Sequence, residues 1–249
     1  MSHGNESGTP QSLTGGAADS AARQISVAID GPAGAGKSTT ARMVARALQI
    51  VYVDSGAMYR AVAWKCLTTG LASSETEAVG ELARSVDIKF YPAETPEGVQ
   101  RLEVDGVDVT TAIRTPEISQ AASTVSTIPA VRETLVAKQR VFGQSGGVVM
   151  EGRDIGTVVL PNAELKIFLT ASLDERAKRR FNELVQRGDA TADLDTVRAE
   201  MAERDRRDST RTMSPLRAAD DAIVIDSDHL IAQEVVDKII SMAIERTAA

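Results

Sequence analysis

One glycine-rich segment combines residue types and a spacing that suit phosphate binding. Gly31 and Gly36 enclose four residues and precede Lys37 and Ser38, which fits the pattern G-x-x-x-x-G-K-[ST] of a P-loop. The glycines let successive backbone N–H groups turn toward one centre, where phosphate oxygens sit. Lys37 adds a positive charge over the β- and γ-phosphates, and the Ser38 hydroxyl can ligate Mg²⁺. The predicted phosphate-binding residues are Gly31, Pro32, Ala33, Gly34, Ala35, Gly36, Lys37, Ser38 and Thr39.

A second polar cluster, residues 54–60, follows the short apolar run at residues 51–53. Ser55 is predicted to cap a helix that begins here, and Arg60 falls in its second turn. One interpretation is a cap beside a solvated arginine. The other is that Ser55 and Arg60 grip a second phosphate opposite the P-loop, as a phosphoryl-transfer enzyme requires.

A third cluster, Glu151 to Asp154, closes a strand predicted at residues 147–150. Glu151 could hold Mg²⁺ through water, and Arg153 could clamp an acceptor phosphate with two hydrogen bonds. Asp154 could accept hydrogen bonds from the amino group of a base. The alternative is a strand end whose charges form ordinary salt bridges.

Arginines crowd residues 203–211. Arg204, Asp208 and Arg211 are spaced i, i+4 and i+7, so they would share one helical face. Such a row can follow transferring phosphates while the aspartate orients them. The alternative is a solvated helix laced with salt bridges. Another basic group, residues 176–180, is interpreted as exposed.

Composition narrows the functional classes. The 249 residues are 43% hydrophobic and 25% charged, which suits one α/β domain with insertions. The net charge of −7 disfavours nucleic acid as the main partner. Cys66 is the only cysteine, which indicates a reducing compartment, and neither His3 nor His229 lies in a cluster that could act as a base or metal site. No apolar run reaches the length of a membrane span and no signal-peptide core is present, so we expect a cytoplasmic protein without membrane contact.

The elements that must position these clusters alternate along the chain. Strands are predicted at residues 25–30, 51–53, 147–150, 165–169 and 222–225, and helices at about 39–48, 58–67, 129–144, 173–187, 193–211 and 230–246. This order predicts an α/β fold: a P-loop doubly wound parallel sheet flanked by helices. Because ligands bind beyond the carboxyl ends of such strands, the clusters should converge on one crevice.

Four parts of the chain differ in pattern. Residues 1–23 are rich in Gly, Ser, Ala and Thr and are predicted to form a disordered tail. Residues 24–84 and 116–249 are predicted to form the core domain. Residues 85–115 alternate with period 2 and contain an Asp-Gly turn, which predicts a small antiparallel β insert.

Several of these stretches resemble bacterial cytidylate kinases, in order from about residue 25 to residue 245. They are GPAGAGKST at 31–39, DSGAMYR at 54–60, EGRDIGTVV at 151–159, KIFL at 166–169 and ERDRRD at 203–208. The resemblance implies ATP-dependent phosphorylation of CMP and dCMP with Mg²⁺, by a protein that we expect to be a monomer. It also implies that residues 85–115 are the monophosphate-binding insert and that residues 187–212 form a helical lid within the core.

The resemblance further implies roles for individual positions. The P-loop residues would bind ATP, with Ser38 on the metal. The CMP phosphate would be held by Ser55, Arg60 and Arg153, the cytosine edge would be read by Ser123, Arg132 and Asp154, and the sugar would be reached by Arg204 and Asp208. Arg211 would contact the phosphates. The catalytic residues would be Lys37, Arg153, Arg204 and Arg211.

Two other functions stay open. The nearer is a P-loop kinase for another small acceptor, such as a thymidylate, adenylate or shikimate kinase. The other is a nucleotide-binding switch or scaffold without turnover. A GTPase switch usually carries N-K-x-D, and none of Asn5, Asn162 or Asn182 begins that string.

Overall fold

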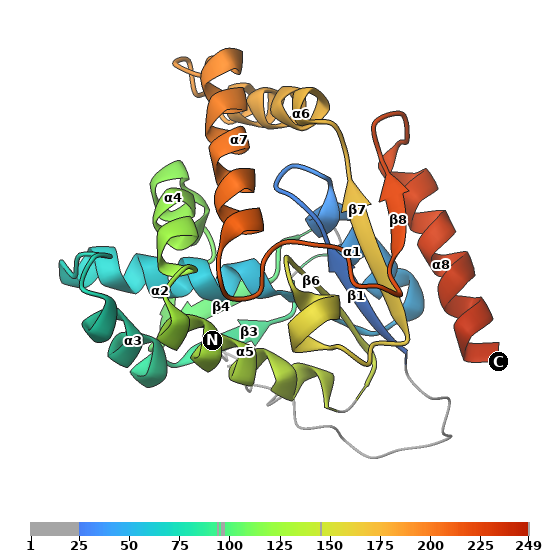
Figure 1. Cartoon of the computed structure of the whole chain (residues 1–249), viewed down its shortest axis with the longest axis horizontal. Coiled ribbons are helices and arrows are strands. Elements are labelled where there is room, and N and C mark those ends of the chain that lie inside the picture. The colour runs from blue at the N-terminus through green and yellow to red at the C-terminus, as the bar shows by residue number, and fades with distance from the viewer. Residues whose placement is uncertain (1–24, 94, 96–97, 145, 249) are drawn as a thin grey trace, which may run out of the picture.

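A parallel five-stranded sheet lies at the centre of the protein. The computed structural model describes residues 25–93, 95, 98–144 and 146–248, so the tail predicted at residues 1–23 lies outside the described residues. The strand order is β2-β6-β1-β7-β8, and every neighbouring pair is parallel. The strands are β1 (Ser26–Asp30), β2 (Val51–Asp54), β6 (Val148–Gly152), β7 (Leu165–Thr170) and β8 (Ile223–Asp226). The predicted doubly wound α/β fold is confirmed (Figure 1).

Helices cover both faces of this sheet, which explains why its inner strands are continuously apolar. On one face, Val27 and Ile29 of β1 pack with α1 (Lys37–Leu48) and α8 (Ala232–Ala248). On the other face, Ala28 joins a larger cluster with α2 and α5. These helices span Ser55–Thr69 and Pro129–Gly143. Cys66 of α2 is buried in that cluster, as a core residue would be.

The antiparallel insert is present and shares the core of the main body. It consists of β3 (Ile88–Tyr91), β4 (Arg101–Val104) and β5 (Val107–Asp108). The predicted Asp-Gly turn joins β4 to β5, with φ of 50° at Asp105 and 79° at Gly106. Side chains from β3 and β4 lie in the same apolar cluster as β2 and α2, so the small sheet has no separate core.

Two helices beside the insert were not predicted. They are α3 (Thr76–Ser85) and α4 (Pro116–Val125). The start of α4 carries a local signal, because the Thr115 side chain accepts a hydrogen bond from Ile118 N and Pro116 occupies the first turn. A 3₁₀ turn, η1 (Ala112–Arg114), leads into α4, and a one-turn π-helix, η2 (Ile155–Val159), follows β6.

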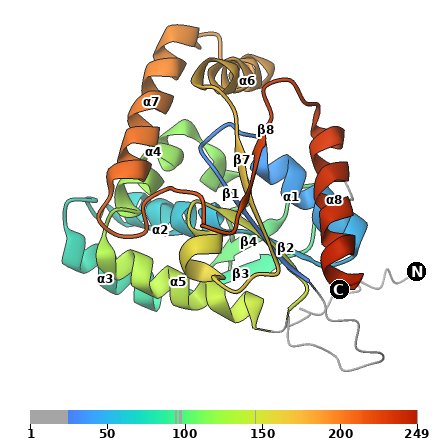
Figure 2. The ribbon, with the colours of Figure 1, turned by 45° about the vertical axis from the view of Figure 1, so that its right-hand side comes forward.

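Helices α6 (Leu173–Gln186) and α7 (Leu194–Thr210) stand together beyond the sheet. Figures 1 and 2 both show this pair rising above the carboxyl end of β7, with α7 over α2 and α4. Within the described residues, the buried apolar side chains that they share are Ala177, Val197 and Met201, and Ala33, Leu173 and Leu184 pack against these while partly exposed. Polar contacts must therefore contribute much of what holds α7 against the rest of the protein.

Two further observations concern the end of the chain and membranes. Helix α8 begins at Ala232, later than the start expected at about residue 230, and Ile231, just before it, is 67% exposed. Within the described residues, none of the helices combines the length and apolarity that crossing a membrane would need.

Candidate active site

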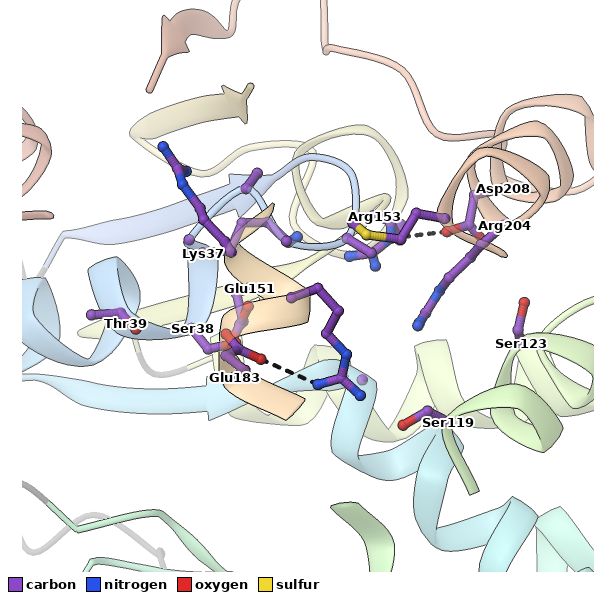
Figure 3. Close-up of a pocket in the computed structure, with 18 of the residues that line it drawn as sticks. Lys37, Ser38, Thr39, Ser119, Ser123, Glu151, Arg153, Glu183, Arg204 and Asp208 are labelled. Atoms are coloured by element: carbon purple, nitrogen blue, oxygen red, sulfur yellow. Dashed lines mark hydrogen bonds and ion pairs between the residues drawn. The ribbon is translucent and has the colours of Figure 1, made fainter. Parts of the chain in front are cut away.

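A cavity of about 1080 Å³ lies beyond the carboxyl ends of β1, β2 and β6. Its walls come from the P-loop, the start of α2, helix α4, the turn after β6 and the pair α6–α7. Figure 3 shows Lys37 and Ser38 on one side and Ser123 on the other, with Arg153 and Arg204 between them. The predicted convergence of the polar clusters on one crevice is thus seen in the fold.

The P-loop follows β1 directly and needs glycine at its first position. Gly31 has a φ of +148°, and a Cβ there would lie 1.9 Å from the carbonyl oxygen of Leu169 in β7. At the end of the loop, the Lys37 Nζ donates a hydrogen bond to the Pro32 carbonyl at 2.6 Å. The loop therefore folds tightly around the ammonium group, while Ser38 and Thr39 stay exposed at the start of α1.

The surroundings of Lys37 destabilise the charged form of its ammonium group. Burial lowers the pKa of Lys37 to about 7, and the positive charges of Arg153 and Arg204 add to the decrease, while Glu151 opposes it. Burial, with Arg153 again adding, lowers the pKa of Arg204 to about 10. Buried cations that lower one another's pKa in this way are stabilised in their charged forms by an anion placed between them.

The cluster after β2 is arranged differently from the prediction. Asp54, and not Ser55, is the N-cap of α2, because Asp54 has the extended backbone and its Oδ1 accepts from Ala57 N at 3.0 Å. Ser55 is already the first helical residue. Its hydroxyl donates to the Glu151 carbonyl at 2.6 Å and thereby ties α2 to β6.

Arg60 is held by the same aspartate. The Arg60 Nη2 lies 2.7 Å from Asp54 Oδ2. Burial alone would raise the pKa of Asp54, but Arg60 and Arg114 outweigh it and hold that pKa below its usual value. Arg114, from η1, also lines the cavity. Sequence reasoning missed Arg114 because it lies in the predicted insert, away from every charged cluster.

The turn that carries Arg153 and Asp154 is fixed by a second missed residue, Asp30. Its carboxylate accepts hydrogen bonds from Ile155 N at 2.8 Å and Gly156 N at 2.7 Å. Burial raises the pKa of Asp30 to about 6 despite these bonds. A carboxylate that follows the apolar run at residues 27–29 and comes just before a P-loop is the signal that could have identified it.

The three residues assigned to the cytosine edge lie on one part of the wall. Arg132 and Asp154 form a buried ion pair, and Arg132 also donates to the Ser126 carbonyl at 3.2 Å. The guanidinium of Arg132 lies 5.5 Å from the centre of the Tyr59 ring, which places Tyr59 beside the same corner. Ser123 lines the cavity with them.

Helix α7 turns one charged face toward the cavity. Asp208 is buried, and its Oδ2 accepts a hydrogen bond from Arg153 Nε at 3.0 Å. Arg211, just past the end of α7, lies 3.9 Å from both Asp208 and Asp154 through its two terminal nitrogens. The interpretation of this face as merely solvated is wrong for Asp208, although Arg206 on the far side is exposed and pairs with Glu203.

Arg176 was interpreted as exposed, and this is wrong. It is 5% exposed and donates to the carbonyls of Ala171 at 2.9 Å and Ala33 at 3.1 Å. Its remaining nitrogen lies 2.7 Å from Asp205 of α7. Arg176 therefore joins the P-loop to the helix pair, a role that a run of basic residues in the sequence does not reveal.

The side chains near Ser38 fit a magnesium ion that also binds substrate phosphate. Glu151 lies beside Ser38 and accepts a hydrogen bond from the Tyr52 hydroxyl at 2.6 Å. Burial, with the neighbouring Asp54 adding, raises the pKa of Glu151, so a nearby cation would stabilise its carboxylate. No group of three or more potential ligands among His, Cys, Asp and Glu occurs in the described part of the chain. One hydroxyl and one carboxylate suit Mg²⁺, which keeps waters and takes its other ligands from phosphates.

Comparison with known proteins identifies the family of this chain. Residues 27–245 match the family model described as cytidylate kinase. The cytidylate kinase of Listeria monocytogenes serovar 1/2a (strain ATCC BAA-679 / EGD-e) is 48% identical over 221 residues, which cover 89% of this chain and 96% of that protein. The bifunctional pantoate ligase/cytidylate kinase of Synechococcus sp. (strain JA-3-3Ab) is 48% identical over 230 residues, 91% of this chain and 42% of that protein. The chain thus spans about two fifths of the bifunctional relatives. It belongs to the cytidylate kinase family.

Proposed function

We propose that this protein transfers the γ-phosphate of ATP to CMP and dCMP, giving CDP and dCDP by direct in-line transfer. The observation that supports this most is the pair of cationic groups that face one another across a single cavity. Lys37 belongs to the donor loop and Arg60 to the wall formed by α2, while Arg153 and Arg204 lie between Lys37 and Ser123. A site for a single phosphate would need either the donor-side cation or the acceptor-side cations, and not both.

On the donor side, residues 31–39 would hold the triphosphate of ATP through backbone N–H groups. Lys37 would neutralise charge on the β- and γ-phosphates. Mg²⁺ would be held by Ser38 directly and by Glu151 through water, and when bound it would supply charge neutralisation on the transferring group. The position of Glu151 beside Ser38 supports this assignment.

On the acceptor side, Ser55, Arg60 and Arg153 would hold the phosphate of CMP. Arg60 and Arg153 each have an aspartate partner, Asp54 and Asp208, which orients the guanidinium. The Nη1 of Arg153 also donates to the Gly152 carbonyl at 3.2 Å, so its Nη2 would be the nitrogen that meets the phosphate. Arg114 would add a further positive charge here. Arg204 and Asp208 would reach the sugar of CMP from α7, where Asp208 is already in contact with Arg153.

The corner formed by Ser123, Arg132 and Asp154 suits cytosine. Cytosine presents an N4 amino donor where uracil and thymine present an O4 acceptor. The Asp154 carboxylate would accept from the amino group, and it would repel an O4 oxygen. Arg132 would donate to the ring acceptors while its pairing with Asp154 keeps both groups fixed.

No general base is required for this reaction. The second pKa of the acceptor phosphate is about 6, so CMP is largely dianionic at pH 7. Catalysis then consists of in-line positioning and of charge neutralisation by Lys37, Arg153, Arg204 and Arg211. Closure of residues 187–212 as a lid would exclude water, which would otherwise accept the phosphoryl group.

The remaining expectations are also part of the proposal. Residues 85–115 act as the monophosphate-binding insert of a core made of residues 24–84 and 116–249. The protein acts as a monomer in the cytoplasm, without nucleic acid or membrane partners. The single buried cysteine supports a reducing compartment.

A panel of acceptors tests the function. The protein is incubated with Mg·ATP and each of CMP, dCMP, UMP, dTMP, AMP and shikimate, and ADP release is followed with a coupled assay. We expect release with CMP and dCMP well above all others. Preference for another acceptor would point to a different P-loop kinase, and ATP binding without acceptor-dependent ADP release would point to a switch or scaffold.

A further inference from the structure

Two buried carboxylates stand directly opposite one another at the end of the central sheet. Asp54 of β2 and Glu151 of β6 are register partners, and they are 7% and 4% exposed. Like charges this close repel one another strongly in a buried site. Each carboxylate therefore needs its own partner to keep a fixed direction.

The partners of the two carboxylates point them to opposite sides. Asp54 is bound by Arg60, on the acceptor side. Glu151 accepts a hydrogen bond from the Tyr52 hydroxyl and lies beside Ser38, on the donor side. The Tyr52 contact, at 2.6 Å, joins two side chains and is not part of any motif named above.

The backbone explains why Tyr52 can reach Glu151. Tyr52 is the register partner of Val149, two residues before Glu151, and residues two apart on a strand share a face. The phenol thus extends along the sheet surface past Val149, with its ring packed against the apolar cluster beneath α1. In this position its hydroxyl meets the carboxylate that closes the neighbouring strand.

Tyr52 is itself held from outside the central sheet. Gln100, just before β4 of the insert, donates from Nε2 to the Tyr52 carbonyl at 2.7 Å. Since β2 is the edge strand of the central sheet, this contact fixes the strand where the phenol starts. The direction of Glu151 therefore depends on a contact between the insert and the core.

We propose that Tyr52 is a positioning residue, which aims the Glu151 carboxylate at Ser38 and away from Arg60. This inference deepens the proposed function and rests on its donor site, where Ser38 and Glu151 would hold Mg²⁺. Without the hydroxyl, Glu151 is free to rotate toward Arg60. Binding of the metal together with the donor would weaken, although every residue that touches the nucleotide would remain.

The test is the gain in ATP affinity that Mg²⁺ provides, measured without acceptor. Calorimetric titration with ATP in excess Mg²⁺ and in EDTA gives this ratio for the full chain. We expect Tyr52→Phe to lower the ratio about tenfold, the usual scale for a hydrogen bond to a charged group, with no change in metal-free affinity. Tyr91→Phe is the matched control, because Tyr91 donates to Glu103 at 2.8 Å in the insert, outside the cavity wall.

A second variant connects the effect to the carboxylate. In a Glu151→Gln background, Tyr52→Phe should produce no further loss in the ratio. An unchanged ratio in Tyr52→Phe, an equal loss in Tyr91→Phe, or equal losses with and without Mg²⁺ would each overturn the inference. The affinity ratio is measured without an acceptor, so it does not depend on CMP phosphorylation. A wild-type protein that fails to phosphorylate CMP would contradict the proposed function without deciding the role of Tyr52.

Discussion

The two sides of the cavity are built in different ways. The donor side is one continuous loop, residues 31–39, whose backbone lies against β7, with Glu151 beside it. The acceptor side is assembled from distant segments, namely residues 54–60, 114, 123–132, 152–154 and 204–211. Backbone N–H groups dominate the first, and paired side chains such as Arg153–Asp208 dominate the second. The donor side should therefore depend on few side chains, and the acceptor side on several coupled ones.

Lys37 should be the most sensitive position on the donor side, because it is the one side-chain cation of the loop. We expect Lys37→Ala to lower kcat by about 10³-fold, the scale for losing one group that stabilises transition-state charge. The exposed Lys178→Ala on α6 serves as the control. Steady-state kinetics with saturating CMP measures the effect, and a variant that folds and retains normal turnover would exclude this role for Lys37.

Arg153 should show the contrasting behaviour of the acceptor side. We expect Arg153→Ala to lower kcat/KM for CMP by about 10²-fold, while the affinity for ATP measured without acceptor changes little. Arg206→Ala removes an exposed arginine that is paired with Glu203 on the far side of α7, and it should have no effect. Equal losses of ATP and CMP binding in Arg153→Ala would show that the two sides are not separate.

Asp154 allows a test of specificity within the acceptor side. Asp154→Asn places an amide where the carboxylate would meet the N4 amino group of cytosine, so the amide nitrogen could donate to the O4 of uracil. We expect the ratio of kcat/KM for CMP to that for UMP to fall at least about tenfold. This ratio is independent of the folded fraction, which matters because Asp154 is ion-paired to buried Arg132. An unchanged ratio would remove Asp154 from base recognition.

The smallest predicted effect is the uptake of a proton when ATP binds. The pKa of Lys37 is lowered to about 7, chiefly by burial, so at pH 8 the free protein holds this group mostly neutral. Phosphate oxygens favour the protonated form and raise its pKa, so binding of ATP at pH 8 should take up close to one proton. Calorimetry in buffers of different ionisation enthalpy measures this number.

Lys37→Arg provides the control for that measurement, because a guanidinium stays protonated throughout this range. It should show no uptake of a proton attributable to this position. Proton release by the wild-type protein, or equal uptake by the two proteins, would contradict the electrostatic description of the donor side.

The same contrast explains how much of the site could be predicted from the sequence. The P-loop was found because its geometry requires specific residue types at fixed spacing, and Gly31 shows why, since no larger residue fits against Leu169. The parallel order of the strands followed from alternating apolar runs. Motifs on the acceptor side also marked Arg60 and Arg153 correctly as lining the cavity.

Most contacts between distant segments left no local signal. Tyr52 and Arg114 act on residues far away in the sequence, and each looks ordinary among its neighbours. Asp30 is the exception, because its place between an apolar strand and the P-loop was a signal that the sequence analysis did not use. Arg176 was misjudged for the same reason, because its burial depends on Ala33 and Asp205 rather than on its own helix. The exchange of Ser55 for Asp54 as the cap was a one-residue error at a helix start, where both residue types suit the position.

In the proposed reaction, the cavity joins a donor phosphate site to an acceptor phosphate site, so that the phosphoryl group passes directly from ATP to CMP. The most direct measurement follows ATP labelled in the γ-phosphate through a single turnover with CMP. We predict that the label appears in CDP at the rate at which it leaves ATP, and only when CMP is present. Direct transfer would be contradicted if the label appeared in inorganic phosphate at a rate independent of CMP, or if it were retained on the protein.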